Sequence, residues 1–336
     1  MRIDVFAHLL PDPYFQRLLA AASPSAANLQ KRVSAIPSIH DLNVRFRMMD
    51  QFPDYCQILS LAAPAIESLG TPDTSLDFAA LGNDSLAELV ARYPERFAGF
   101  IASLPMNAPD AALRELERAI DQLGARGVQF YSNANGKPLD RPEFEPLFAA
   151  MVQRDLPIWI HPERNSQFAD YVDEDNSRFE LWWVFGWPYE TSIAMSRIVF
   201  AGYFDKYPNL KIITHHGGAM IPFFSGRIGP GLDQLGARTP DHQKPALTEH
   251  HLKRRPFDYF KMFYADTALF GAPHAIRCAL DFFGADHVLF ASDMPFDPEK
   301  GTQFIRTTIA DLDSLGLDPS TRKAIDEGNA RRLLHL

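Results

Sequence analysis

The feature that most constrains the fold of this chain is a series of eight short apolar runs separated by longer segments. The longer segments include helical patterns: residues 84–93 and 110–123 repeat apolar side chains at helical spacing. Strands that alternate with helices predict a parallel sheet. The eight predicted strands lie at residues 3–7, 57–61, 97–102, 127–131, 157–160, 211–214, 262–265 and 287–291.

Eight strand–helix units predict a closed (β/α)8 TIM barrel of the α/β class, because eight strands close this fold. The alternative, an open doubly wound sheet, calls for a glycine-rich turn after the first strand. The sequence there is His8-Leu9-Leu10-Pro11, which contains no glycine. We therefore predict one barrel domain over residues 1–336. Residues 23–40 and 236–256 fit no barrel element and are predicted to be insertions.

The charge and cysteine content narrow the possible partners. The 336 residues include 33 basic and 42 acidic side chains, a net charge of −9, which disfavours nucleic acid as a partner. The two cysteines, Cys56 and Cys278, are far apart and indicate a reducing compartment. No uncharged apolar run reaches the ~18–20 residues that span a bilayer, and no signal-peptide pattern begins the sequence. We expect a cytoplasmic protein that binds no membrane.

Histidine or aspartate follows five of the eight predicted strands. In a barrel these strand ends meet at the face that carries the active site, and imidazole and carboxylate are the usual ligands of a catalytic zinc ion. Taken singly, each residue has a structural interpretation, such as a hydrogen-bonded histidine or an aspartate that caps the next helix. Their number favours a shared polar site. The residues are His8, His161, His215, His216, Asp266 and Asp293.

The adjacent pair His215-His216 poses a geometric question. Neighbours on an extended strand point to opposite faces, so only one of them reaches the site unless the chain bends. Gly217 and Gly218 follow directly and permit such a bend. A polar turn without a functional role is the alternative.

Short motifs run along nearly the whole chain, among them Ile160-His161-Pro162, His216-Gly217-Gly218 and Ser292-Asp293-Met294-Pro295. In order and spacing, they resemble those of the aminocarboxymuconate-semialdehyde decarboxylase family within the amidohydrolase superfamily. The other matching segments are residues 2–8, 44–50, 92–97, 104–106, 183–188, 208–211, 226–228 and 328–333.

This resemblance implies a (β/α)8 barrel that holds one divalent metal, with Zn²⁺ expected, Mn²⁺ as the alternative and no organic cofactor. The family's metal ligands fall on His8, His161 and Asp293. Its catalytic histidine falls on His216, and Asp293 is expected to share protons with bound water or substrate as well as to hold the metal.

The resemblance also implies the reaction and the substrate contacts. Family members remove CO₂ without oxygen from small unsaturated or hydroxyaromatic carboxylic acids, and some related barrels hydrolyse lactones instead. An active-site tryptophan falls on Trp183, for which core packing is the alternative role. A substrate-binding arginine that relatives lend across a dimer interface falls on Arg227, which therefore predicts a homodimer. The alternative for Arg227 is an exposed structural residue.

One departure from the family pattern concerns the first ligand position, which here is Phe6. A phenyl ring cannot coordinate a metal, but three protein ligands suffice for a catalytic zinc. His215 and Asp4 are the candidates to replace the missing ligand. We therefore predict a metal-dependent decarboxylase. A metal-dependent hydrolase or lactonase is one alternative, and a binding protein that has lost the metal is another.

Overall fold

The strands of the molecule occupy the predicted positions. The computed structural model describes residues 1–336 apart from 22–30, 32, 34 and 249–251. The barrel strands are β1 (Arg2–Leu9), β2 (Tyr55–Leu61), β3 (Phe97–Phe100), β4 (Ala102–Ser103), β5 (Val128–Tyr131), β8 (Ile158–His161), β9 (Ile212–Thr214), β10 (Tyr264–Asp266) and β11 (Val288–Leu289). A small hairpin is formed by β6 (Asn133–Ala134) and β7 (Lys137–Pro138).

The parallel strands close into a barrel, which confirms the predicted fold class. They pair in the orders β1-β2-β3 and β11-β10-β9-β8-β5-β4. Only Ile101 separates β3 from β4, so these two form one strand position, and Ile101 N–H donates to Leu59 O at 2.9 Å. At the remaining seam Val5 N–H donates to Phe290 O at 3.0 Å, and Ala7 bridges Met294 in parallel.

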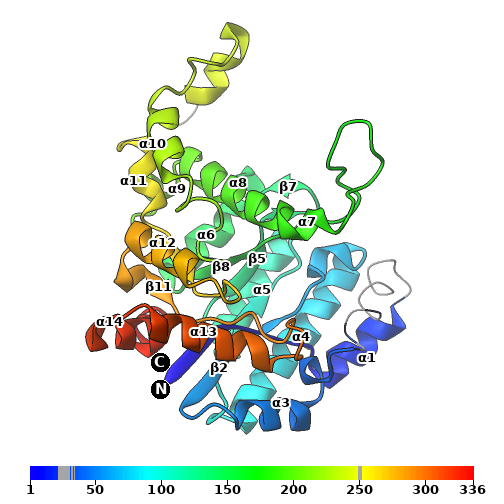
Figure 1. Ribbon diagram of the computed structural model, residues 1–336. Helices are drawn as coiled ribbons and strands as arrows, with labels where there is room; N and C mark the ends of the chain where they lie inside the picture. The colour runs from blue at the N-terminus through cyan, green and yellow to red at the C-terminus, as the bar shows by residue number, and fades with distance from the viewer. Residues whose placement is uncertain (22–30, 32, 34, 249–251) are drawn as a thin grey trace.

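Helices surround the strands (Figure 1). The α-helices are α1 (Asp12–Ala20), α3 (Leu42–Met49), α4 (Pro72–Arg92), α5 (Pro109–Asp121), α6 (Glu145–Gln153), α7 (Leu181–Val184), α8 (Gly186–Phe200), α9 (Tyr203–Lys206), α10 (Ser225–Asp233), α11 (Pro256–Phe260), α12 (Pro273–Phe283), α13 (Thr302–Ser314), α14 (Pro319–Lys323) and α15 (Asn329–Leu334). Shorter 3₁₀ turns are η1 (Pro37–Ile39), η2 (Ile66–Ser68), η3 (Pro142–Phe144), η4 (Asp241–Thr248) and η5 (Ala285–His287), and η6 (Ala324–Gly328) is a π-helix.

Helix α4 is much longer than the predicted segment 84–93. It begins at Pro72, with Thr71 as the N-cap whose hydroxyl accepts a hydrogen bond from Thr74 N–H. Asn83 lies inside the helix, where its amide would otherwise be a buried group without a partner. The amide is satisfied because it donates to Ser103 O and to the Glu115 carboxylate of α5. Asn83, which directly precedes the predicted segment 84–93, is therefore an interior contact between helix and barrel.

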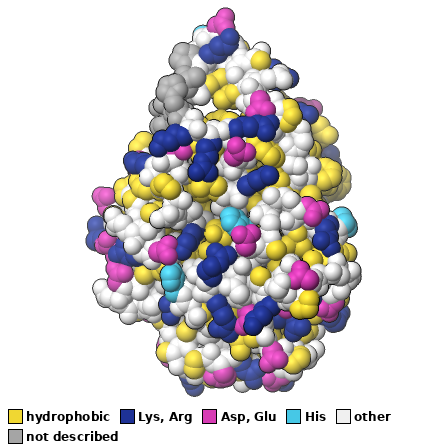
Figure 2. All heavy atoms as spheres, turned by 90° about the vertical axis from the view of Figure 1, so that its left-hand side faces the viewer, with side chains coloured by type: hydrophobic (Ala, Val, Ile, Leu, Met, Phe, Trp, Pro, Cys, Tyr) yellow, Lys and Arg dark blue, Asp and Glu magenta, His cyan; other side chains and the backbone are white. Residues whose placement is uncertain are grey.

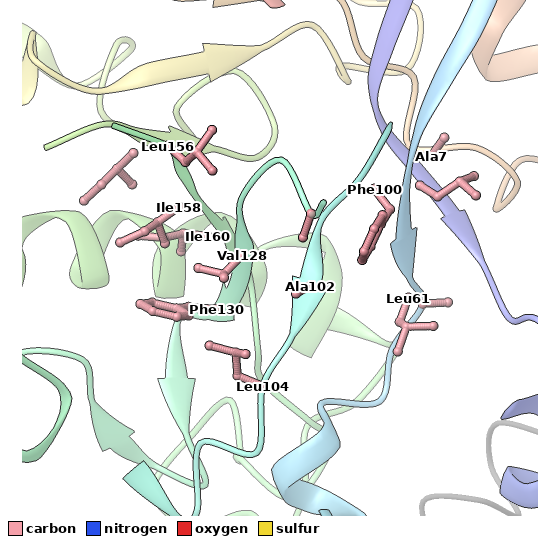
Figure 3. Packing of buried hydrophobic residues seen from close by; sticks show 14 of the residues in the cluster. Ala7, Leu61, Phe100, Ala102, Leu104, Val128, Phe130, Leu156, Ile158 and Ile160 are labelled. Atoms are coloured by element: carbon pink, nitrogen blue, oxygen red, sulfur yellow. The ribbon is translucent and has the colours of Figure 1, made fainter. Parts of the chain in front are cut away.

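Buried side chains fill two layers. One set packs between strands and helices and includes Phe130, Ile158 and Ile160, which point the same way in Figure 3. The other set lies inside the barrel and includes Trp159, whose indole N–H donates to Val5 O at 3.2 Å. The register of β1 shifts between Asp4 and Ala7, and both Val5 and Phe6 belong to the inner set.

Two segments project from the barrel in Figure 1. The chain around η4 extends beyond α10 and belongs to the predicted insertion 236–256, of which 249–251 lie outside the described residues. A second excursion, residues 162–180 between β8 and α7, was not predicted. Of the insertion predicted at 23–40, residues 23–30, 32 and 34 lie outside the described part. On the face shown in Figure 2, basic and acidic side chains of the described residues are interspersed. None of the described helices is long and apolar enough to cross a membrane.

Candidate functional site

The strand ends bring a cluster of histidines and aspartates together at one end of the barrel. His8 lies in β1, His161 is the last residue of β8, and His215 follows β9 directly. Asp266 ends β10, and Asp293 lies just after β11. All five side chains are buried. The predicted convergence of polar residues from different strands is therefore present in the fold.

Asp293 occupies the centre of this cluster. Its Oδ1 lies 3.0 Å from His8 Nε2 and 3.2 Å from His215 Nε2, and its Oδ2 lies 3.6 Å from His216 Nε2. The residue has a left-handed backbone with φ of 60°, and its N–H donates to Phe6 O at 3.1 Å. This turn positions the carboxylate among the three imidazoles.

Three of the imidazoles form a hydrogen bond through the ring nitrogen Nδ1. His8 Nδ1 contacts Ser60 Oγ at 3.0 Å, His161 Nδ1 donates to Pro162 O at 2.7 Å, and His215 Nδ1 is hydrogen-bonded to Asp266. Partners of this kind set the orientation of metal-binding histidines in proteins. Each ring therefore presents Nε2 as the atom available to a ligand.

The cluster fits a divalent cation. Ligand atoms of His8, His161 and His215 lie within 4.8 Å of one another, and so do those of His215, His216 and Asp293. The Nε2 atoms of His8 and His215 are buried and have no hydrogen-bond partner among the described residues, although both lie close to Asp293. Buried nitrogens without a hydrogen bond are costly unless an ion occupies the space between them. Imidazole and carboxylate donors suit both zinc and manganese.

The electrostatics of the cluster keep three of its imidazoles neutral and its central carboxylate ionised. Burial lowers the pKa of His8, His161 and His216, so these imidazoles are mostly neutral at pH 7. Burial also disfavours a charged His215, but Asp266 and Asp293 outweigh it and raise the pKa of His215 to about 9. Against the effect of burial, His215 and the other imidazoles hold the pKa of Asp293 well below its usual range. Neutral imidazoles and an ionised carboxylate are the forms that bind metal, so His8, His161 and Asp293 are already in that form, whereas His215 would release a proton on binding it.

The backbone after β9 bends so that both adjacent histidines face the cluster. His216, Gly217 and Gly218 all have positive φ, at 57°, 63° and 79°. As a result the rings of His215 and His216 stack with centroids 4.0 Å apart, and Gly217 N–H donates to Asp266 Oδ1 at 2.9 Å. The bend that the two glycines permit is therefore the observed arrangement.

Of the two candidates to replace a ligand at position 6, only His215 lies in the cluster. The Phe6 ring stacks on the His215 ring with centroids 3.6 Å apart and planes 13° apart. Asp4 is instead held by Tyr55 Oη at 2.6 Å and by the Ser292 hydroxyl, and burial raises its pKa to about 6. The hydrogen bonds of Asp4 therefore connect β1 to β2 and to the segment after β11.

Among the described residues, neither predicted substrate-binding residue has a ring contact or ion pair with the histidines and aspartates of this cluster. Trp183 in α7 is 39% exposed and donates to Glu180 Oε2. Its neighbour in the same motif, Trp187, places its ring edge-on to His161 with centroids 5.5 Å apart. Arg227 on α10 is exposed and has no ion pair with any described residue. Because both tryptophans belong to one motif, the sequence alone did not distinguish them.

Two further residues at the site were not predicted. Tyr131, the last residue of β5, lies against His161 with ring centroids 4.9 Å apart. Glu163 follows His161 by two positions, and burial, together with Glu190, raises its pKa to about 7. Glu163 directly follows the Ile160-His161-Pro162 motif. This position beside a predicted metal ligand could have identified it from the sequence.

The model of the amidohydrolase family matches residues 3–336. The chain belongs to the amidohydrolase family. The chain is 35% identical over 306 residues to a gamma-resorcylate decarboxylase from Polaromonas sp., covering 87% of this chain and 86% of the relative. It is 31% identical over 296 residues to the 2-amino-3-carboxymuconate-6-semialdehyde decarboxylase of Dictyostelium discoideum, covering 83% and 78%. These relatives confirm the resemblance drawn from the motifs.

Solved structures give the same relationship. The chain superposes on a 5-carboxyvanillate decarboxylase from Sphingomonas paucimobilis with a TM-score of 0.83 and 25% identity, over 100% of this chain and 99% of that one. It superposes on a dihydroxybenzoic acid decarboxylase from Polaromonas sp. with a TM-score of 0.77 and 27% identity, over 100% and 97%. The second structure contains manganese and the inhibitor 2-nitroresorcinol.

Proposed function

We propose that this protein is a metal-dependent, non-oxidative decarboxylase of a small hydroxyaromatic or unsaturated carboxylic acid. The observation that carries the proposal is the buried cluster of histidines around Asp293 at the barrel mouth, in a chain whose similar relatives are decarboxylases. His8, His161 and Asp293 would hold the metal. The resemblance favours zinc, and manganese is the alternative because the Polaromonas structure contains it.

Decarboxylation breaks the bond between the carboxyl carbon and the carbon that carries it. The electron pair stays on that carbon, CO₂ leaves, and one proton is added, so the acid becomes the corresponding unsubstituted compound. A bound divalent cation supplies Lewis acidity toward a carboxylate or a neighbouring oxygen of the substrate.

His216 is suited to deliver the proton. Its side chain is 12% exposed, whereas those of His8 and His215 are fully buried, so His216 is the most exposed of these three histidines. Burial lowers its pKa and makes its protonated form a stronger acid. Asp293 Oδ2 lies 3.6 Å from His216 Nε2, and its negative charge stabilises the protonated form of the ring.

Aromatic side chains flank the place where a planar substrate would bind. Phe270 lies edge-on to His216 with ring centroids 5.4 Å apart, Phe296 contacts His8, and Trp187 contacts His161. Trp183 would extend this wall through its contact with Trp187. We also propose a homodimer in which Arg227 of one copy pairs with the substrate carboxylate in the other. Arg227 is exposed and forms no ion pair with any described residue, which supports this role.

The test combines metal analysis with product analysis. Gently purified protein should contain about one equivalent of zinc or manganese, and metal-loaded protein should release CO₂ from at least one acid of a panel. The panel contains 2,6-dihydroxybenzoate, 5-carboxyvanillate and 2-amino-3-carboxymuconate semialdehyde, with matched aryl lactones to detect hydrolysis. Metal-loaded protein that releases no CO₂ from any acid would refute the proposal, and lactone cleavage without CO₂ would identify a hydrolase.

A further inference from the structure

The first step of the inference concerns the side chain at position 6. Phe6 faces the inside of the barrel, is fully buried, and stands where the resemblance places a metal ligand. Its ring lies flat against the imidazole of His215, with centroids 3.6 Å apart. A ligand at position 6 would occupy the space beside the metal cluster. In this chain the stacked rings of Phe6 and His215 fill that space, and the His215 ring carries nitrogen atoms that can bind a metal.

The second step is the position of His215 Nε2. This atom lies 3.2 Å from Asp293 Oδ1, the same oxygen that lies 3.0 Å from His8 Nε2. His215 is the residue shared by the two groups of possible ligands, one with His8 and His161 and the other with His216 and Asp293. Its Nε2 is buried without a hydrogen-bond partner among the described residues. The nitrogen is thus directed at the point where the other ligands converge.

The third step is the support behind the ring. Asp266 is fully buried and is hydrogen-bonded to His215 Nδ1. The carboxylate itself accepts hydrogen bonds from Gly217 N–H at 2.9 Å and Ala268 N–H at 3.1 Å, so it cannot swing away. A carboxylate–histidine pair of this kind is typical of metal ligands. A base acting on substrate would need access, but the side chain of His215 is fully buried, whereas that of His216 is 12% exposed.

We infer that His215 is a metal ligand in this chain and replaces the ligand that Phe6 cannot provide. The metal centre then consists of His8, His161, His215 and Asp293, with Asp266 as the residue that positions His215, and His216 remains free to act on the substrate. This inference rests on the metal site in the proposed function but concerns the ligand set alone. Metal binding, not turnover, is therefore the measurement that tests it.

The stacked pair allows a direct exchange of rings. Binding of Co²⁺ to metal-free protein is measured by isothermal titration and by the visible spectrum of the bound ion. His215→Phe should lower the affinity at least tenfold, and Asp266→Asn about 10- to 100-fold. The double variant F6H/H215F returns one imidazole to the stack and should recover most of the affinity. His216→Phe is the matched control and should bind Co²⁺ with wild-type affinity. Wild-type affinity in H215F, or a loss confined to H216F, overturns the inference.

A measurement on the unaltered protein keeps the inference testable if H215F does not fold. X-ray absorption at the metal edge of the wild-type Co²⁺ and Mn²⁺ forms counts coordinated imidazoles. Three imidazoles support the inference, and two overturn it. If the metal has two imidazole ligands and the protein releases CO₂, the ligand set is wrong but the proposed decarboxylase stands. If the metal has three imidazole ligands and no CO₂ is released, the ligand set stands and only the decarboxylase is refuted. A wild-type protein that binds neither ion overturns the ligand set and the metal dependence together.

Discussion

A buried chain of hydrogen bonds connects Arg45 to the segment after β11 that carries Asp293, and replacing Tyr55 by phenylalanine should break it. Arg45 Nε donates to Gln57 Oε1 at 2.8 Å, Gln57 Nε2 donates to Tyr55 Oη at 2.9 Å, and Tyr55 Oη donates to Asp4 Oδ2 at 2.6 Å. Asp4 also accepts a hydrogen bond from Ser292 N–H at 3.1 Å. Tyr55→Phe deletes one oxygen from this chain and leaves no large cavity.

The free energy of unfolding should fall by about 3 kcal/mol at pH 8. A hydrogen bond to an ionised acceptor contributes about 1.5–3 kcal/mol, and the unpaired Gln57 amide adds about 1–3 kcal/mol. Burial raises the pKa of Asp4 to about 6, and the Tyr55 hydrogen bond opposes this rise. Because the pKa of Asp4 is higher in the folded protein than in the unfolded chain, the wild-type protein loses folding stability as pH rises from about 4 to 6. Without the Tyr55 hydrogen bond the pKa of Asp4 is higher still, so Y55F should continue to lose stability above pH 6. The destabilisation should therefore be larger at pH 8 than at pH 5.

Equilibrium urea unfolding at both pH values, followed by circular dichroism and tryptophan fluorescence, measures this difference. The midpoint should move to lower urea with an unchanged slope. Tyr171, which is 72% exposed, supplies the matched control, and Y171F should change the unfolding free energy by less than about 0.5 kcal/mol. A loss in Y55F below about 0.5 kcal/mol, or an equal loss at both pH values, would refute the reasoning.

Three further variants test the site and its surroundings. Asp293→Asn should lose bound metal and all measurable CO₂ release. It should keep its circular dichroism, because asparagine tolerates the φ of 60° at this position. A variant that retains about one equivalent of metal and normal turnover would contradict the proposed site. Burial raises the pKa of Glu67 from its ordinary 4.5 to about 8, so the wild-type protein loses stability as pH rises between these values. Glu67→Gln removes that loss and should gain stability over the wild type, up to ~4 kcal/mol by pH 9 in urea unfolding; parallel pH profiles would show the reasoning to be wrong. Arg227→Met should raise KM for the acid about 10- to 100-fold in steady-state assays, the value of a charge-assisted hydrogen-bonded pair; an unchanged KM would exclude Arg227 from substrate binding.

The sequence by itself determined the barrel and the face that carries the site. The alternation of buried runs and helical patterns is local, because each strand or helix shows its own hydrophobic period along a few residues. Helix α5 was predicted at 110–123 and spans Pro109–Asp121, since Pro109 and Gly124 mark its ends in the sequence. The polar strand ends followed from the same pattern, because closure of a parallel barrel brings these ends to one face.

The tertiary structure decided which of these side chains meet. The bend at His216 turns both histidines inward, and the shift of register in β1 sets Phe6 against His215, more than 200 positions away in the sequence. The choice of Trp187 over Trp183 as the contact of His161 depends on where α8, which begins at Gly186, lies relative to the end of β8. These outcomes depend on backbone bends and on contacts between distant segments. Hydrophobic period does not specify them, and the two glycines after His216 permit the bend without requiring it, so only the closed barrel decides them.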